Sequence, residues 1–395
     1  MTTEADVVQA TKQLLADFPP ETTKPGDFWG AQYDAGLAWV HFPVGRGGLA
    51  ASPKLQEKID MALREAAAPI NMGYNPIGVG MAAPTVLTHG SDELIDATLR
   101  KNFTCEEVWC QLFSEPGAGS DLAGLSTKAV RDGDEWILNG QKVWTTLAHM
   151  ATWGLVVART DSEAPKHKGL TYFVMDMHAE GVEVRPLRQI TGEAEFNEVY
   201  MTDARVPDLH RLGEVGNGWA VSMTTLMNER VSIGGSIAQR GSGPIGDAVK
   251  LWKQYGHDDP AVRDELMRLW CDAETARLTN IRAQMARVGG NPGPEGSTGK
   301  LAYAENNKAI YAFSMNLRGA DGMLIGGDGY KLTRPTHAGF AGEGETTKAF
   351  LRSRANSIEG GTSEIMRNIL GERILGLPGE PRVDKDLPWS KVPRS

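Results

Sequence analysis

Residues 113–146 read FSEPGAGSDLAGLSTKAVRDGDEWILNGQKVWTT, and this stretch decides the expected fold. It begins with a polar, glycine-rich loop from Ser114 to Ser120 and continues as short segments rich in β-branched and aromatic residues. Asp132-Gly133-Asp134 and Asn139-Gly140 are typical turn sequences. The stretch ends in Trp144-Thr145-Thr146. We therefore expect strands joined by tight turns, next to a glycine-rich loop.

The same residues suit a planar cofactor that carries phosphate groups. Gly117 and Gly119 allow the backbone to approach a ligand closely and leave N–H groups free to bond it. Trp144 offers a flat face, and Thr145 or Thr146 offers a hydroxyl at its edge. Taken alone, however, such a loop is more often an ordinary turn of a β-hairpin than a cofactor site.

The order of several motifs favours the cofactor site. SEPGAGSD (114–121) and NGQKVWTT (139–146) are followed near the other end by EGGTSEIMRNILGERILGLP (359–378). Together they resemble the signatures of the acyl-CoA dehydrogenase flavoproteins, in particular actinobacterial-type subunits. The resemblance extends to DAGLAWVHFPVGRGGLA (34–50) and GVGMAAPTVLTHG (78–90), and so covers most of the chain.

This resemblance implies a reaction. Acyl-CoA dehydrogenases are FAD enzymes that convert an acyl-CoA to the trans-2-enoyl-CoA in fatty acid β-oxidation and lipid metabolism. A carboxylate base removes the α-proton, the flavin accepts a hydride from the β-carbon, and electron-transfer flavoprotein is the expected electron acceptor. We therefore expect an oxidoreductase with FAD as its cofactor and acyl-CoA as its substrate.

Composition and charge agree with a globular enzyme. The chain has 395 residues, of which 41% are hydrophobic and 23% charged, which is enough for two or three domains with sizeable cores. Its formal net charge of −9 argues against a nucleic-acid-binding protein. No apolar run reaches the roughly 18 residues that a membrane span needs. The N-terminal residues do not resemble a signal or transit peptide, so we expect a cytoplasmic protein.

The three cysteines, Cys105, Cys110 and Cys271, are odd in number and lack the spacing of metal ligands or redox motifs. We expect them to be buried free thiols, and we expect no metal site.

Hydrophobic periodicity predicts an α+β fold in three parts. Residues 1–107 have helical spacing, which predicts an N-terminal helical domain. Residues 108–211 contain short strands separated by turns and form the expected central β-domain. Helical patterns return in residues 212–395, where the resemblance implies a four-helix-bundle domain. GGNPGPEGS (289–297) and residues 326–345 are expected to be irregular connections.

The resemblance also implies two possible positions for the base. One precedes the Gly-Thr of the C-terminal motif, where this chain has Gly360, with Glu359 one residue earlier. The other precedes an arginine on the helix after the β-domain, where this chain has Glu229 followed by Arg230. Apolar neighbours such as Leu226 and Val231 argue that this helix is buried, so we expect Glu229 to be the base. Glu359 is the second candidate, and Arg230 is expected near the substrate.

The remaining site residues carry over by position. Phe113 and Ser114 are expected to contact the flavin ring, with Trp144 stacked on it and Thr146 bonded at its edge. Gly119 and Ser120 are expected at the mouth, near flavin or thioester, and Thr362 and Glu364 at the adenine-dinucleotide end. Each of these residues also has an ordinary structural explanation, as a core side chain or a turn cap.

Two departures from the family pattern concern assembly. An R-x-x-F-G motif that binds a neighbouring subunit's flavin diphosphate corresponds here to Trp252-Lys253-Gln254-Tyr255-Gly256, without the arginine. Met323 stands where a glutamine is expected, before the glycines of IGGDG. The resemblance implies a homo- or heterotetramer. Since an indole cannot replace a guanidinium at a diphosphate, the missing arginine favours the heterotetramer with a second dehydrogenase subunit.

Three other functions remain open. The chain could be a flavin-poor partner subunit of such a heterotetramer, including one that acts on sterol side chains. It could also be a flavin monooxygenase or a nitroalkane oxidase built on the same scaffold.

Overall fold

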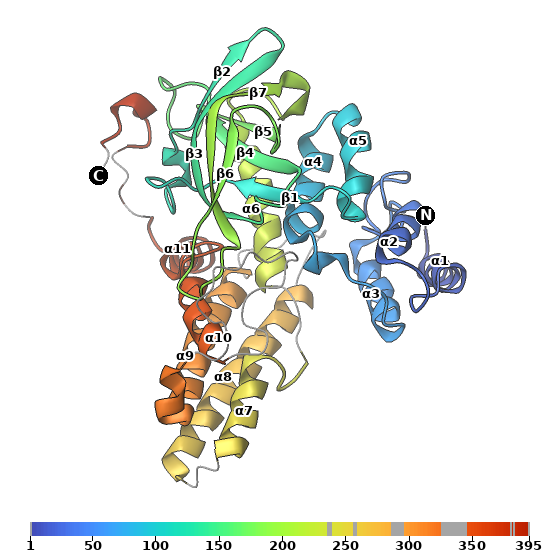
Figure 1. The fold of residues 1–395 in the computed structure, drawn as a ribbon, viewed down its shortest axis with the longest axis vertical. Helices are drawn as coiled ribbons and strands as arrows, with labels where there is room; N and C mark the ends of the chain where they lie inside the picture. The colour runs from blue at the N-terminus through green and yellow to red at the C-terminus, as the bar shows by residue number, and fades with distance from the viewer. Residues whose placement is uncertain are drawn as a thin grey trace.

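The computed structural model describes residues 2–234, 239–255, 259–285, 296–324, 346–379, 381 and 384–393, without the side chains of residues 230–234 and 284. Within these ranges the molecule has three regions, namely helices, a β-sheet and a second set of helices (Figure 1). The expected α+β class is therefore confirmed.

The first region is helical and lies on one side of the sheet (Figure 1). Its helices are α1 (Glu4–Asp17), α2 (Pro25–Asp34), α3 (Gln56–Glu65), α4 (Ala83–His89) and α5 (Asp92–Phe103), with a π-helical turn, η3, at Gly78–Ala82. Two starts follow from capping residues: the Thr3 hydroxyl accepts from the Asp6 N–H at the start of α1, and the Ser91 hydroxyl accepts from the Leu94 N–H at the start of α5.

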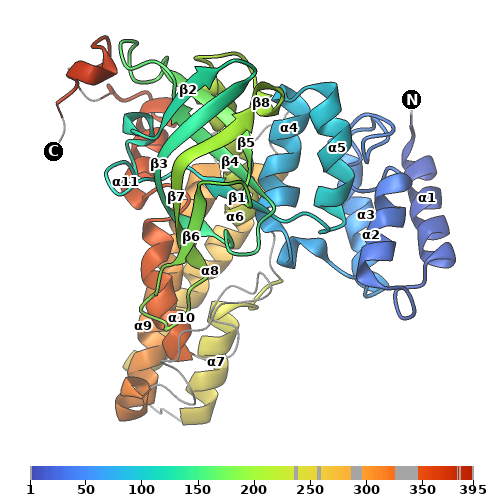
Figure 2. The ribbon, with the colours of Figure 1, turned by 45° about the horizontal axis from the view of Figure 1, so that its top comes forward.

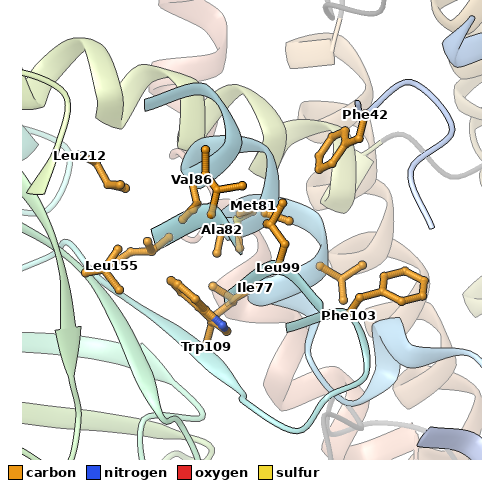
Figure 3. Packing of buried hydrophobic residues seen from close by; sticks show 14 of the residues in the cluster. Phe42, Ile77, Met81, Ala82, Val86, Leu99, Phe103, Trp109, Leu155 and Leu212 are labelled. Carbon is orange, nitrogen blue, oxygen red and sulfur yellow. The ribbon is translucent and has the colours of Figure 1, made fainter. Parts of the chain in front are cut away.

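A shared hydrophobic core joins these helices to the sheet. Figure 3 shows Val86 and Ala82 from α4 and η3 beside Leu155 and Trp109 from the strands. Trp109 and Leu155 are completely buried. Burial of an aliphatic side chain of this size stabilises a fold by roughly 1.5–3 kcal/mol, so this interface holds the first region firmly against the sheet.

The second region is an eight-stranded sheet with the order β6-β7-β3-β2-β4-β5-β8, in which β1 also pairs with β4. The strands are β1 (Trp109–Leu112), β2 (Lys128–Asp132), β3 (Glu135–Thr146), β4 (Trp153–Arg159), β5 (Leu170–Asp176), β6 (Val182–Pro186), β7 (Phe196–Pro207) and β8 (Arg211–Leu212). Most pairs are antiparallel, whereas β1 and β2 meet β4 in parallel. The expected domain limit after residue 211 falls within β8, and the three-domain division stays a prediction.

One predicted turn is correct and one is wrong. Asp132 and Glu135 are paired, with Gly133 at φ +63°, so Asp132-Gly133-Asp134 is the turn of the β2–β3 hairpin. Asn139-Gly140 lies instead inside β3, at a register shift in its pairing with β7. A side chain at residue 140 would meet the Thr127 hydroxyl at 2.4 Å, so this glycine permits close strand approach rather than chain reversal.

The third region consists of helices that extend away from the sheet (Figure 2). They are α6 (Gly218–Gly234), α7 (Pro244–Tyr255), α8 (Pro260–Met285), α9 (Gly296–Arg318), α10 (Thr346–Ser353) and α11 (Ser363–Ile369). Helix α9 is central, because α6, α7, α8, α10 and α11 all pack on it. Helix α6 also packs on β5, α4 and η3, so it is the element at which the three regions meet.

No helix in the described ranges combines the length and the apolar character needed to cross a membrane. The cysteines differ from expectation at two positions, because Cys105 is only partly buried and Cys271 is exposed. All three are free and Cys110 is buried, but Cys271 is exposed on α8. Its neighbours in the sequence, Trp270 and Leu269, face the helix core instead.

Candidate active site

The structure brings the glycine-rich loop against the end of β3. The Val143 N–H donates to the Ser114 carbonyl at 2.9 Å, and the Lys142 ammonium donates to the Phe113 carbonyl at 3.0 Å. Reciprocal backbone hydrogen bonds of 3.0 Å between Glu115 and Ala118 close a tight turn within the loop. Phe113 and Ser114, expected at the flavin ring, are thus adjacent to the strand that carries Trp144.

A buried ion pair holds this junction. The Lys142 ammonium lies 2.9 Å from a Glu115 oxygen, with 0% and 5% of their side chains exposed. The Glu115 carboxylate also accepts from the Ser126 and Thr127 N–H groups at 2.7 and 2.9 Å. Burial acts to raise the pKa of Glu115, but the Lys142 charge and these hydrogen bonds outweigh it and lower that pKa to about 2. The carboxylate is therefore ionised and fixed, which suits a structural support rather than a base.

Trp144 has the geometry of a ring presented to a ligand. It follows a register shift in β3, has φ +61°, and is 58% exposed. Its ring meets Phe196 edge to face, with centroids 5.9 Å apart. A tryptophan in the left-handed region is strained, and such strain is retained mainly at functional positions. The exposed indole, the half-buried Thr146 and the Thr145 hydroxyl fit a planar ligand with polar edges, since the Thr145 hydroxyl is buried and has no partner among the described residues.

The glycine-rich loop is open on its outer side. A Cβ added to Gly117 or Gly119 would meet no atom within 4 Å, so neither glycine is needed for packing inside the chain. Gly119 and Ser120 are both exposed. This fits their expected place at the mouth of the site, where a bound group would occupy the open side.

Glu229 lies on α6 and is partly buried. Its carboxylate interacts electrostatically with the buried phenol of Tyr172 on β5 and with the buried ammonium of Lys300 on α9. The Lys300 ammonium is held by the carbonyls of Asn356 and Gly361, at 2.8 and 2.6 Å. Glu229 therefore faces the junction of the three regions. The side chain of Arg230 lies outside the described residues.

Glu359, the second candidate base, is engaged in an ion pair. Both of its oxygens accept from the Arg352 guanidinium, at 3.0 and 2.9 Å, and one also accepts from the Asn356 amide at 2.8 Å. Arg352 in turn donates to the buried Glu195 carboxylate at 3.2 Å, and its guanidinium lies over the Phe196 ring. This network ties the chain before α11 to the strand beneath Trp144.

Thr362 and Glu364 lie at the start of α11. The Thr362 hydroxyl accepts from the Ile365 N–H at 3.1 Å and so caps the helix. Glu364 is exposed and lies 3.6 Å from Arg367. The structure thus gives Thr362 a local structural role, and a role of either residue at the dinucleotide stays a prediction.

The structure describes only part of the two motifs in which the sequence departs from the family pattern. Trp252 on α7 is partly buried and packs against the apolar cluster of α7, α8 and α9. Met323 is 81% exposed. Gly256 and residues 325–345, which include IGGDG, lie outside the described residues. Across the described ranges, no group of three His, Cys, Asp or Glu side chains is arranged to hold a metal ion.

Comparison with known proteins identifies the family. The family model described as "Acyl-CoA dehydrogenase, middle domain" matches residues 110–204, and "Acyl-CoA dehydrogenase, C-terminal domain" matches residues 216–375. The acyl-CoA dehydrogenase IpdE1 of Mycobacterium tuberculosis is 35% identical over 88% of this chain and 86% of its own. The chain belongs to the acyl-CoA dehydrogenase family. This confirms the resemblance, the oxidoreductase class and the FAD cofactor expected from the sequence.

Other relatives extend the comparison. Acyl-CoA dehydrogenase FadE34 of M. tuberculosis is 41% identical over 87% of this chain, which spans 45% of that relative's length. Among solved structures, the Tcur3481-Tcur3483 steroid ACAD is 25% identical with a TM-score of 0.72, and covers 95% of this chain and 97% of that one. The ChsE4-ChsE5 complex of M. tuberculosis is 25% identical with a TM-score of 0.71, and covers 96% and 100%.

Several residues at this site were missed by the sequence analysis. Glu115 and Lys142 stand within the quoted motifs, and a lysine among the alternating apolar residues of a strand is a signal that it is buried with a partner. Tyr172 gave no such signal, because its contact with Thr225 spans 53 residues. Arg352 pairs with Glu359 seven residues later and with Glu195 157 residues earlier, and no local pattern marks either contact.

Proposed function

We propose that this protein catalyses the FAD-dependent α,β-dehydrogenation of an acyl-CoA thioester, with Glu229 as the base that takes the α-proton. The observation that carries the proposal is the contrast between its two candidate carboxylates. Glu359 is bound on both oxygens by Arg352, whereas Glu229 lies on the helix at which the three regions meet. A partly buried carboxylate beside apolar groups is suited to proton abstraction.

The chain's own residues fit the cofactor. Phe113, Ser114, Trp144 and Thr146 would hold its ring system, and Gly119 and Ser120 would line the mouth. Thr362 and Glu364 would contact its dinucleotide end. When bound, FAD supplies the acceptor for the substrate's β-hydride. The Glu115–Lys142 pair supports this function from beneath, because it fixes the loop that carries Phe113 and Ser114 against β3.

The proposal extends to assembly and substrate class. Relatives of this fold include a structure named a steroid ACAD and one named a ChsE4-ChsE5 complex. Together with the packing of Trp252 against the apolar cluster of α7, α8 and α9, these names support a heterotetramer with a second dehydrogenase subunit and a steroid acyl-CoA as substrate. Electron-transfer flavoprotein is the proposed electron acceptor.

Anaerobic titration of the purified protein tests this function. Straight-chain, branched and steroid acyl-CoA thioesters are added in turn while the flavin absorbance is followed. We expect the steroid acyl-CoA thioesters to bleach the flavin most strongly. If no thioester bleaches the flavin, bleaching by nitroalkanes in a parallel titration, or consumption of NADPH and oxygen in an aerobic assay, would replace dehydrogenation with one of the alternative functions. A flavin-free protein, even when co-expressed with a second dehydrogenase subunit, would indicate the partner-subunit role.

A further inference from the structure

A chain of three buried hydroxyl groups connects the three regions of the molecule. The Tyr172 hydroxyl on β5 lies 2.9 Å from the Thr225 hydroxyl on α6, which lies 3.0 Å from the Thr85 hydroxyl on α4. All three side chains are completely buried. The chain ends where the Thr85 hydroxyl donates to the Met81 carbonyl at 2.7 Å. Met81 belongs to η3, a π-helical turn of the kind often found at functional sites.

The Met81 carbonyl can only accept a hydrogen bond, and this determines which hydroxyl is the donor in each hydrogen bond of the chain. Each hydroxyl has a single proton, and Thr85 gives its proton to Met81. Thr225 can therefore satisfy Thr85 only by donating to it, and its other acceptor, the Val221 carbonyl, is more distant at 3.4 Å. Whether Thr225 donates its proton to Thr85 or to the Val221 carbonyl, it has none left for Tyr172. Tyr172 must therefore donate its own proton to the Thr225 oxygen. The Tyr172 oxygen then has a lone pair left, and no proton, for any other group.

Tyr172 is hydrogen-bonded to the helix that carries the proposed base, through Thr225. Glu229 follows Thr225 by four residues, so the two side chains project from the same face of α6. The Glu229 carboxylate acts electrostatically on the Tyr172 phenol. On its other side the Tyr172 ring meets Phe113 edge to face, with centroids 5.8 Å apart. Tyr172 thus stands between a residue proposed to contact the flavin and the helix proposed to carry the base.

We propose that Tyr172 is a positioning residue for Glu229, whose phenol oxygen accepts a hydrogen bond from the neutral carboxyl group that forms when Glu229 takes the α-proton. The inference rests on the proposed function and adds to it a group that favours the proton-bound base. A hydrogen bond to the neutral form of an acid raises its affinity for the proton. A tyrosine free to rotate would instead donate to the carboxylate and have the opposite effect. The hydroxyl chain to Met81 prevents that rotation.

Other ionisable groups around this face of α6 have separate partners. Lys300, on α9, is held by two backbone carbonyls, and its charge acts in the opposite direction by favouring the ionised Glu229. His89, on α4, bonds the hydroxyl of Thr224 at 2.9 Å. Arg159 on β4 donates to the carbonyls of Ala123 and Leu125, and η3 has no ionisable side chain. Burial raises the pKa of Tyr172, so the phenol keeps its proton.

Exchange of the substrate's α-hydrogen tests this role without flavin reduction. In the 3-thia analogue of the acyl-CoA class that bleaches the flavin, a sulfur replaces the β-carbon, so the thioester cannot be dehydrogenated although its α-hydrogens remain acidic. The FAD-loaded enzyme, in its native assembly, is incubated with this probe in deuterated buffer, and deuterium uptake is measured by mass spectrometry across the pH range. The rate should fall at low pH, as the base becomes protonated before it meets the substrate.

Tyr172→Phe removes only the hydroxyl. In the pH profile of the exchange rate, we expect the acid limb, where the rate falls at low pH, to move down by about half to one pH unit. A shift of this size corresponds to the free energy of one neutral hydrogen bond. The plateau rate should fall about three- to tenfold. Thr225→Val leaves the Tyr172 proton free to donate to the carboxylate, so the limb should move further down. The double variant should return to the Tyr172→Phe position. Tyr33→Phe, at a buried tyrosine of α2, is the matched control and should not move the limb.

Two failures can be told apart. Exchange that persists in Glu229→Gln would overturn the proposed base, and this inference with it. The other failure concerns Tyr172 alone. It would be shown if exchange stops in Glu229→Gln, but the pH profile of the exchange rate in folded, FAD-loaded Tyr172→Phe has the same acid limb as that of the parent protein.

Discussion

Arg352 binds both carboxylate oxygens of Glu359, at 3.0 and 2.9 Å, from a position where it also contacts Glu195 and covers Phe196. Bidentate pairs of this kind are stronger than single hydrogen bonds. Removing the charge in Glu359→Gln should lower the free energy of unfolding by roughly 1–3 kcal/mol, toward the low end because the Glu359 side chain is 30% exposed.

Flavin reduction by acyl-CoA should change less than tenfold in the same variant, because a carboxylate held in this way is not available as a base. Urea unfolding and stopped-flow absorbance measure the two effects. Glu364→Gln, at the exposed partner of Arg367, is the control and should leave stability nearly unchanged. Loss of flavin reduction in Glu359→Gln, with stability preserved, would reassign the base to Glu359.

The Glu115–Lys142 pair predicts how stability depends on pH. The folded-state pKa of Glu115 is lowered to about 2, below the value of an unfolded carboxyl group, so the unfolded chain binds the extra proton as pH falls. The pair therefore stabilises the protein fully above about pH 4.5, and this contribution is lost as pH falls toward 2.

Glu115→Gln should cost about 3–5 kcal/mol near neutral pH, since it leaves the Lys142 charge buried without a counter-ion. The difference from the parent protein should shrink between pH 4.5 and 2. Urea unfolding across this range measures it. Glu135→Gln, at an exposed pair with Arg205, should cost less than about 1 kcal/mol, and a comparable cost at both positions would contradict the argument.

The exposed ring of Trp144 predicts a role in holding the cofactor. Trp144→Ala should lower flavin retention several-fold and shift the visible spectrum, because ring stacking contributes on the order of 1 kcal/mol. Thr146→Ala should have a similar effect through the loss of one hydrogen bond. Flavin-to-protein ratios after gel filtration test both. Phe18→Ala, at a partly exposed ring beyond the end of α1, is the control, and equal retention in all three variants would remove Trp144 and Thr146 from the site.

The C-terminal segment predicts a further contribution to stability. The Trp389 ring lies over the buried guanidinium of Arg159, 4.3 Å from its centroid, and its N–H donates to the Gly124 carbonyl at 3.2 Å. Trp389→Ala should therefore lower the free energy of unfolding by about 1–2 kcal/mol. Chemical unfolding measures this, with the exposed Lys391→Ala as control. An unchanged free energy would show that the segment does not support the sheet.

The hydrophobic patterns predicted much of this fold, because they depend on neighbours in the chain. Short runs rich in β-branched and aromatic residues, WGLVVART and LTYFVMDM, indicated β4 and β5, and Asp132-Gly133-Asp134 indicated a hairpin turn. Asn139-Gly140 misled because a glycine also serves where two strands approach closely, here beside Thr127. Local sequence does not distinguish these two uses.

The site was less predictable, because its interactions join distant residues. Helical spacing placed Glu229 on a buried helix, but nothing near Glu359 in the sequence shows that Arg352 occupies both of its oxygens. The partner of Lys142 lies 27 residues away, and that of Tyr172 lies 53 residues away. The first pairing follows from how a loop folds against β3, and the second from how the sheet packs on α6.

The rate of flavin reduction in Glu229→Gln tests the central claim most directly. The amide keeps the volume of the side chain but cannot accept the α-proton, so reduction by acyl-CoA should fall by roughly 10²–10⁴-fold. Flavin content and acyl-CoA binding, measured by difference absorbance, should be retained. Reduction at the parent rate in this folded, flavin-loaded variant would contradict the assignment of Glu229 as the base.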